Sequence, residues 1–161
     1  MTINLKFYKH FGQISEATVA AYEQRWGIKF PDSYRDFLLK INGGIPEKKF
    51  FSYKESKDDG SLIDVFFGII EERRYSLLLN HLVTYDNRVP LNMLPIADDP
   101  GGNLLLLSIS GSDYGKVYFW DHEMEADEGE TPDYRNLKLI ADSFEEFING
   151  LKSEGEIDHA T

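Results

Sequence analysis

Two segments near the N-terminus place apolar residues three and four positions apart, the spacing that puts them on one face of a helix. Residues 15–26 begin at Ser15, a favourable N-cap, and stop before Gly27, which accepts a left-handed C-cap conformation. Residues 32–42 repeat the pattern and run into Gly43 and Gly44. The pattern therefore predicts a pair of helices, with at least one of the two later glycines at positive φ.

The next part of the chain is rich in aromatic and β-branched residues. Residues 49–53 and 62–67 predict two strands around a polar loop at 54–61. Residues 73–86 have helical spacing and predict a middle helix. Pro90 and Pro95 are expected to bracket a loop that leads into Ile96.

A hairpin is predicted after that loop. Residues 98–102 have tight-turn chemistry, with Pro100 second and Gly101 third in the turn. Residues 103–109 form a nearly continuous apolar run, which is typical of a central strand buried on both faces. Residues 116–120 are the expected antiparallel partner.

The C-terminal part repeats the alternation of strand and helix. Residues 137–141 predict a short strand, and the spacing of Phe144, Phe147, Ile148 and Leu151 predicts a closing helix. The whole order predicts an α+β fold, in which helices pack on a mainly antiparallel or mixed sheet. We expect one domain over 1–152 and a frayed polar tail over 153–161. Seven side chains are expected in the core: Trp26, Phe37, Ile41, Leu105, Leu107, Phe144 and Ile148.

Composition narrows the function classes. The 161 residues are 42% hydrophobic, contain no cysteine and carry a net charge of −11. The negative charge argues against direct binding to nucleic acid or to an anionic membrane surface. The sequence has no apolar run long enough to span a membrane, and its N-terminus lacks the apolar core of a signal peptide. We therefore expect a cytoplasmic protein.

The acidic residues are concentrated near the C-terminus. Residues 121–161 hold 13 acidic and 3 basic residues, and residues 121–133 hold seven acidic residues without Lys or Arg. Like charges repel, so such a cluster does not stabilise the fold. Two interpretations remain open: a solvated, flexible loop, or an electrostatic docking face for a basic partner.

No motif indicates catalysis. The segment from Gly111 to Gly115 has Asp113 where a nucleophile elbow needs Ser. The histidines are not paired, and a calcium-loop alignment from Asp121 fails at its sixth and twelfth positions. Adjacent carboxylates lie where turns and helix starts explain them. The sequence therefore predicts no catalytic residue, no metal ligand and no cofactor.

Four blocks in order resemble the SUKH superfamily, which contains the Smi/Knr-like proteins. They are WGIKFPDSYRDFLLKINGG (26–44), PIADDPGGNLLLLS (95–108), GKVYFWDH (115–122) and SFEEFI (143–148). The resemblance implies an α+β fold and a binding role without catalytic residues. Bacterial members are mostly immunity proteins, which bind a cognate toxin, often a nuclease. Fungal members regulate cell-wall synthesis and carry extra regions that this chain lacks, so the resemblance favours the bacterial role.

The sequence thus predicts a non-enzymatic immunity protein whose partner is a basic toxin. An acidic face can occupy the phosphate-binding cleft of a nuclease and speed association. The candidate contacts are the acids of the C-terminal cluster: Asp121, Glu123, Glu125, Asp127, Glu128 and Glu130. Two alternatives remain, a regulatory or scaffold protein with an endogenous partner and a small metal-dependent enzyme.

Overall fold

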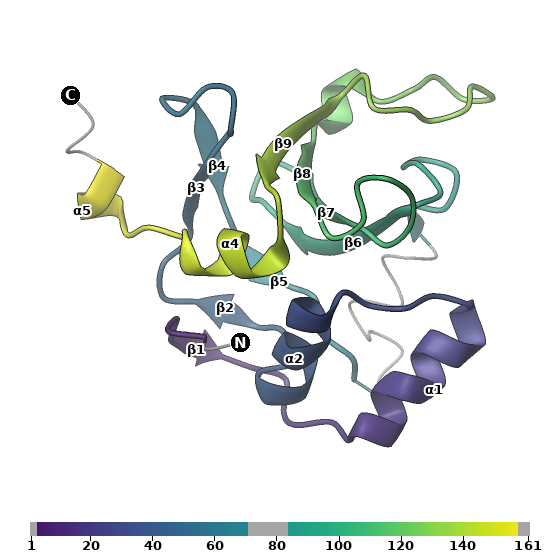
Figure 1. Ribbon diagram of the computed structural model, residues 1–161. Coiled ribbons are helices and arrows are strands. Elements are labelled where there is room, and N and C mark those ends of the chain that lie inside the picture. Colours follow the sequence, from purple (N-terminus) through teal and green to yellow (C-terminus); the bar gives the residue numbers. More distant parts are fainter. Residues whose placement is uncertain (1–2, 71–83, 158–161) are drawn as a thin grey trace.

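The computed structural model describes residues 3–70 and 84–157 (Figure 1). Its helices are α1 (Glu16–Trp26), α2 (Asp32–Lys40), the 3₁₀ turn η1 (His122–Met124), α4 (Phe144–Asn149) and α5 (Glu154–Ile157). Its strands are β1 (Phe7–Lys9), β2 (Ile45–Pro46), β3 (Phe50–Ser52), β4 (Gly60–Leu62), β5 (Val65–Phe66), β6 (Met93–Asp98), β7 (Leu104–Ser108), β8 (Val117–Trp120) and β9 (Leu137–Ala141). The predicted α+β class is confirmed.

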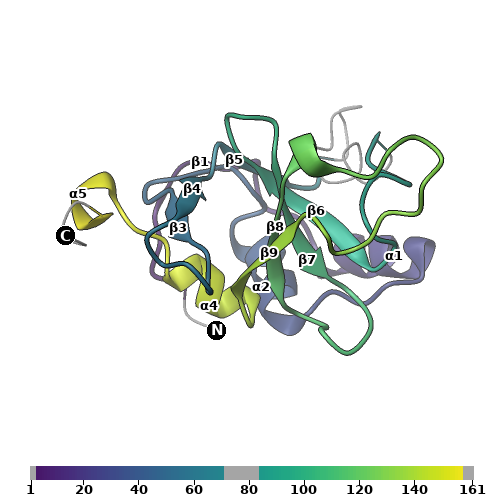
Figure 2. The ribbon, with the colours of Figure 1, turned by 90° about the horizontal axis from the view of Figure 1, so that it is seen from above.

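A five-stranded sheet is the centre of the fold. Its order is β5-β6-β7-β8-β9, and each pair of neighbours is antiparallel. The central strand β7 is buried along its whole length, which confirms the apolar run as a strand covered on both faces. The pairs β1–β2 and β3–β4 lie beside this sheet. Viewed from above, β6 to β9 lie side by side over α1 and α2 (Figure 2).

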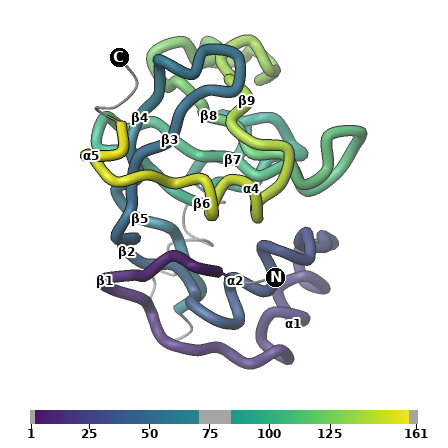
Figure 3. Tube along the Cα trace, turned by 60° about the vertical axis from the view of Figure 1, so that its left-hand side comes forward, coloured from purple at the N-terminus to yellow at the C-terminus, as the bar shows by residue number. Residues whose placement is uncertain are grey.

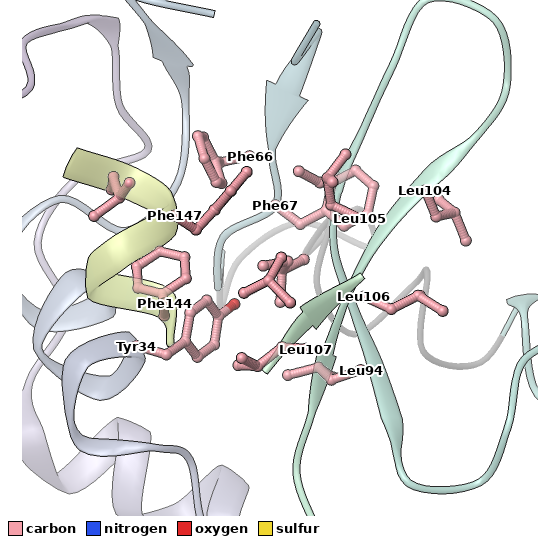
Figure 4. Packing of buried hydrophobic residues seen from close by; sticks show 14 of the residues in the cluster. Tyr34, Phe66, Phe67, Leu94, Leu104, Leu105, Leu106, Leu107, Phe144 and Phe147 are labelled. Atoms are coloured by element: carbon pink, nitrogen blue, oxygen red, sulfur yellow. The ribbon is translucent and has the colours of Figure 1, made fainter. Parts of the chain in front are cut away.

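Aromatic rings join the helices to the sheet. Tyr34 of α2 meets Phe144 of α4 edge-to-face, with ring centroids 5.1 Å apart. Phe37 of α2 meets Phe66 of β5 at 5.3 Å. Figure 4 shows the rings of Tyr34 and Phe144 on the helical side of the core, opposite the leucines of the sheet. Burial of this apolar surface is the main driving force for the layered packing.

The predicted ends of the helix pair are confirmed. Ser15 caps α1, because its Oγ accepts a hydrogen bond from the Thr18 backbone N–H at 3.1 Å. Gly27 ends α1 with φ 64°. After α2 the backbone is left-handed at three successive residues, with φ 62° at Asn42, 78° at Gly43 and 121° at Gly44.

Asn42 has a second role, which the sequence pattern does not reveal. Its side chain is fully buried, and its Oδ1 accepts from the Ile69 N–H at 2.8 Å. Its Nδ2 donates to the carbonyl oxygens of Ile69 at 2.7 Å and Gly12 at 2.9 Å. The end of α2 is therefore hydrogen-bonded to two segments that are distant in sequence.

The single strand expected over residues 62–67 is wrong, because the chain changes sheets there. Ile63 N–H donates to Lys49 O beside the β3–β4 pair, and Asp64 N–H donates to Asp98 O of β6. Both bonds are 2.8–2.9 Å long. The segment is therefore divided into β4, which pairs with β3, and β5, which pairs with β6.

Pro95 lies inside β6, so the loop expected up to this residue is wrong. The strand already begins at Met93, and its register with β7 shifts between Pro95 and Ala97. Proline has no N–H to donate and is tolerated in sheets at such irregularities. The predicted turn that follows is confirmed, with Gly102 N–H donating to Asp99 O at 3.4 Å.

Five of the seven expected core side chains are fully buried, but two are not. Trp26 is 38% exposed, because it is the last residue of α1 and only Val19 of that helix is fully buried. Ile41 is half-buried at the end of α2. The expected helix over 73–86 lies for most of its length outside the described residues.

The chain has regular structure on both sides of the expected boundary between the domain (1–152) and the polar tail (153–161). Lys152 exchanges two backbone hydrogen bonds with Phe50 of β3, at 2.9 and 3.0 Å. Residues 154–157 form α5, where Glu156 pairs with Lys48 at 2.9 Å. Figure 3 shows this segment running from α4 past β3 to α5.

We predict a large loss of stability for Gly44→Ala. A Cβ at Gly44 would overlap the carbonyl oxygen of Lys9, in addition to the left-handed strain at φ 121°. Strain costs about 1–2 kcal/mol and overpacking about 1–3 kcal/mol, so urea unfolding should show a loss of roughly 2–5 kcal/mol. Gly27→Ala is the control. Gly27 is also left-handed, but an added Cβ there would meet no atom within 4 Å, so the free energy of unfolding should fall by only about 1 kcal/mol. Equal losses would contradict the close approach.

We predict that Tyr34→Phe stabilises the protein. The Tyr34 hydroxyl is buried without a hydrogen-bond partner among the described residues, and burial raises its pKa far above the usual range. Its removal should increase the free energy of unfolding by about 1 kcal/mol in urea titrations. Tyr118→Phe is the matched control with the opposite sign, because the Tyr118 hydroxyl donates to Asp113 at 2.8 Å. A loss in Tyr34→Phe would show that the hydroxyl has a partner.

Candidate functional site

The acidic candidates lie in one segment, residues 121–134 between β8 and β9, which we call the acidic loop. Figures 1 and 2 both place it at the end of the molecule opposite β1 and the β3–β4 hairpin. Two sets of side-chain contacts connect it to the body of the protein.

The first anchor is an ion pair near the start of the loop. Arg88 donates from Nε to Oε2 of Glu125 at 3.2 Å and from Nη2 to Oε1 at 3.0 Å. The guanidinium also stacks over the Tyr85 ring at 4.6 Å and lies 5.8 Å from the Trp120 ring. Because the pair is bidentate and one partner is held by aromatic rings, it fixes the loop better than an isolated surface pair would.

The second anchor is a hydrogen-bond network at the end of the loop. The Tyr134 hydroxyl donates to Asp113 Oδ2 at 2.6 Å and accepts from Asn92 Nδ2 at 2.7 Å. Asp113 also accepts from the hydroxyls of Ser108 and Tyr118, each at 2.8 Å. Burial alone would raise the pKa of Asp113, but the hydrogen bonds from Tyr134, Ser108 and Tyr118 lower it overall. The carboxylate is therefore charged at neutral pH and holds the two tyrosines together.

Three of the six candidate acids are engaged in structural contacts. Asp121 Oδ1 caps η1 by accepting from the Glu123 N–H at 3.0 Å. Glu125 forms the first anchor. Glu130 accepts from the Asp127 N–H at 3.3 Å and lies 3.5 Å from Arg135. These contacts order the loop and reduce the charge available at these three positions.

The other three acids, Glu123, Asp127 and Glu128, are exposed. Their side chains form no ion pair or hydrogen bond within residues 3–70 and 84–157. All six candidates therefore lie in the acidic loop, but they fall into two groups. Three of them stabilise the loop through their contacts, and the carboxylates of the other three face solvent. Sequence reasoning missed Arg88, Asn92, Asp113 and Tyr134, since residues 21 to 42 positions apart form these contacts and no local motif marks them.

A separate groove of about 500 Å³ lies between β3, the end of β9 and α4. Its apolar lining includes Phe51, Ile140 and Phe147. Lys54 bridges it by pairing with Asp142 and, at 3.2 Å, with Glu146. Of the charged side chains that line the groove, Lys54 and Glu146 are therefore paired with each other.

Neither a metal cluster nor a membrane span is found in the described part of the chain. No group of three or more His, Asp or Glu side chains is placed there to hold a metal ion. Within the same residues, no helix has the length and apolarity needed to cross a bilayer.

Comparison with known proteins identifies the family. The family model described as SMI1 / KNR4 family (SUKH-1) matches residues 13–150. The chain belongs to this family. The matched residues of this SUKH-1 chain include α1, the five-stranded sheet, the acidic loop and α4. It confirms the resemblance found in the four sequence blocks.

A curated relative agrees with this assignment. The "SPbeta prophage-derived uncharacterized protein YokK" of Bacillus subtilis (strain 168) is 34% identical over 148 residues. The alignment covers 82% of the SUKH-1 chain described here and 71% of the relative.

Among the described residues, the carboxyl group with a raised pKa is that of Asp98, at the end of β6. Burial raises its pKa to about 6, and the nearby charges of Asp64 and Asp99 add to the effect. The Val65 N–H donates to its Oδ1 at 3.2 Å, which opposes the shift without cancelling it. The native state therefore holds a proton on Asp98 at pH values where the unfolded chain has released it.

We predict that this carboxyl lowers stability as the pH rises. Because its folded pKa lies above its unfolded pKa, its contribution is most favourable below about pH 4 and is lost as pH rises through about 6. Asp98→Asn keeps an acceptor for Val65 but cannot ionise, so its stability relative to wild type should increase between pH 4 and 7. Urea unfolding at four pH values measures this difference. A constant difference between the two proteins would contradict the raised pKa.

Proposed function

We propose that this chain is a non-enzymatic immunity protein that binds and neutralises a cognate toxin in the cytoplasm, using the acidic loop as part of its binding face. Membership of the SMI1 / KNR4 family (SUKH-1) supports a role in protein binding. The partner we propose is a basic protein, of which a nuclease is the leading class, because a phosphate-binding cleft must be positively charged. Binding needs no cofactor.

One observation carries this proposal: the acidic loop is held at both ends, while Glu123, Asp127 and Glu128 form no ion pair with any residue of 3–70 or 84–157. A flexible loop would have to lose conformational freedom on binding, whereas an anchored loop has already lost much of it. Within the described part of the chain, these three carboxylates have no ion pair to break before they meet basic groups. The loop therefore combines a fixed shape with available negative charge.

The proposed mechanism is occlusion aided by electrostatic attraction. Three negative charges of one loop attract a basic cleft and raise the rate of encounter. Once seated, the loop would occupy the space that the phosphates of a nucleic acid need. Neutralisation then requires only tight binding at the toxin's cleft.

We predict that the triple variant Glu123→Lys, Asp127→Lys and Glu128→Lys slows association. The first step is a pull-down against the products of neighbouring genes, and failure of every product to bind would count against the proposal. With the toxin in hand, the variant should associate about tenfold more slowly at low salt, and the difference should shrink at high salt. Glu125 is left unchanged because it anchors the loop. Stopped-flow or surface-based kinetics at two salt concentrations measures the effect.

The matched control reverses three acids at the other end of the molecule. Glu47, Glu55 and Asp58 are exposed, and their replacement by Lys changes the net charge by the same amount, from −11 to −5. If the position of the charge matters, this control should slow association much less than the loop variant. Equal slowing would mean that net charge alone acts, and unchanged association in a normally melting loop variant would exclude the acidic loop from the binding face.

A further inference from the structure

The acidic loop is joined to a second segment, residues 88–92, at two points. Arg88 binds Glu125, and Asn92 binds Tyr134. Leu91 lies between the two tie residues and is 89% exposed, the highest value among the large hydrophobic side chains described. The two segments therefore form one composite surface, which includes an almost fully exposed leucine.

The position of Leu91 is fixed by its neighbours. Val89 and Pro90 before it and Met93 after it are buried. The Met93 N–H closes a turn by donating to Pro90 O at 3.0 Å, with Leu91 in the second position of that turn. The backbone thus presents this side chain to solvent on a rigid support.

Met124 is the other exposed aliphatic side chain of the composite surface. It is 64% exposed and precedes Glu125, the residue that Arg88 holds. It belongs to η1, the turn that Asp121 caps. Single exposed apolar residues are common on protein surfaces. Here two of them lie on turns of two segments joined by an ion pair and a hydrogen bond. Three acids of the same loop, Glu123, Asp127 and Glu128, are exposed and form no ion pair among the described residues.

We infer that Leu91 and Met124 are the apolar anchors of a docking surface whose acidic rim is formed by Glu123, Asp127 and Glu128. The occupant is the basic toxin of the proposed function, on which this inference rests, and the toxin presents an apolar pocket beside its basic cleft. Stable interfaces combine an apolar centre with a polar rim, and a few central side chains supply most of the affinity.

Charge selects this occupant over a second copy of the chain. A twofold pairing through the same surface would bring two acidic loops together, and their like charges would repel. A basic partner instead gains from the rim while its pocket takes up the apolar side chains. The rim acids then control association, and the two anchors control dissociation.

The test is the dissociation rate of the toxin complex with Leu91→Ser, Met124→Ser and the double variant. The double variant should dissociate at least about tenfold faster, because its anchors are lost, while association changes by less than about threefold. Tyr8→Ser is the matched control: Tyr8 is 71% exposed on β1, at the other end of the molecule (Figure 1), and its removal should leave both rates unchanged. Melting curves confirm that each variant folds.

The outcomes separate this inference from the proposed function. If wild type binds no toxin, the proposed function fails and the inference fails with it. Suppose that toxin binds wild type and that the triple Lys variant of the rim acids slows association. If the Leu91→Ser, Met124→Ser double variant then dissociates within about twofold of the wild-type rate, only the inference is overturned. A concentration-dependent dimer of wild type that the double variant loses would assign the anchors to a second copy instead, and would also overturn it.

Discussion

The fold depends on a backbone contact that only glycine permits. At Gly43 an added Cβ would lie 2.8 Å from the backbone of Phe66 and Gly68, and at Gly44 it would overlap Lys9. Without side chains at these positions, the end of α2 approaches β5 closely enough for Gly44 and Phe66 to exchange two backbone hydrogen bonds, at 2.8 and 2.9 Å. The buried amide of Asn42 adds three more hydrogen bonds at the same place. Because β5 is the edge strand of the five-stranded sheet, this contact fixes how α2, with Tyr34 and Phe37, packs against the sheet.

The sheet in turn positions the candidate binding surface. The acidic loop leaves β8 and returns into β9, and the segment that anchors it leads into β6. In the register of the sheet, the start of β6 lies level with the start of β8, whereas the acidic loop is attached at the end of β8 and the start of β9. The two anchors therefore tie the acidic loop back to a segment that enters the sheet at the opposite end of the strands. The protein balances two demands there. Arg88 and the Asp113 network order the loop by pairing with Glu125 and Tyr134. Glu123, Asp127 and Glu128 form no ion pair among the described residues and are the acids that we propose meet a partner. The cost of like-charge repulsion is a small loss of stability at a place far from the core.

Local patterns predicted the elements, and non-local contacts explain the errors. Ser15, Gly27 and the apolar run of β7 carry their signals within a few residues, so the helix ends and the central strand were confirmed. The sequence predicts a loop at Pro95, because the register shift that accommodates this proline depends on the partner strand β7, which the local sequence does not reveal. Likewise, helical periodicity predicts a buried Trp26, but its burial depends on where α1 ends relative to its neighbours. For the candidate site, charge counting located the loop. It could not distinguish anchoring acids from free ones, because contacts such as Arg88 with Glu125 join residues 37 positions apart.

The central claim is that the acidic loop and the segment tied to it form the binding face. Amide hydrogen exchange of the chain with and without its purified toxin tests this claim most directly, since bound surfaces exchange more slowly. The account predicts new protection in residues 88–92 and 121–134, with β1, β2 and the β3–β4 hairpin unchanged. Protection confined to the hairpin and the groove beside α4, with the acidic loop exchanging as it does in the free protein, would contradict it.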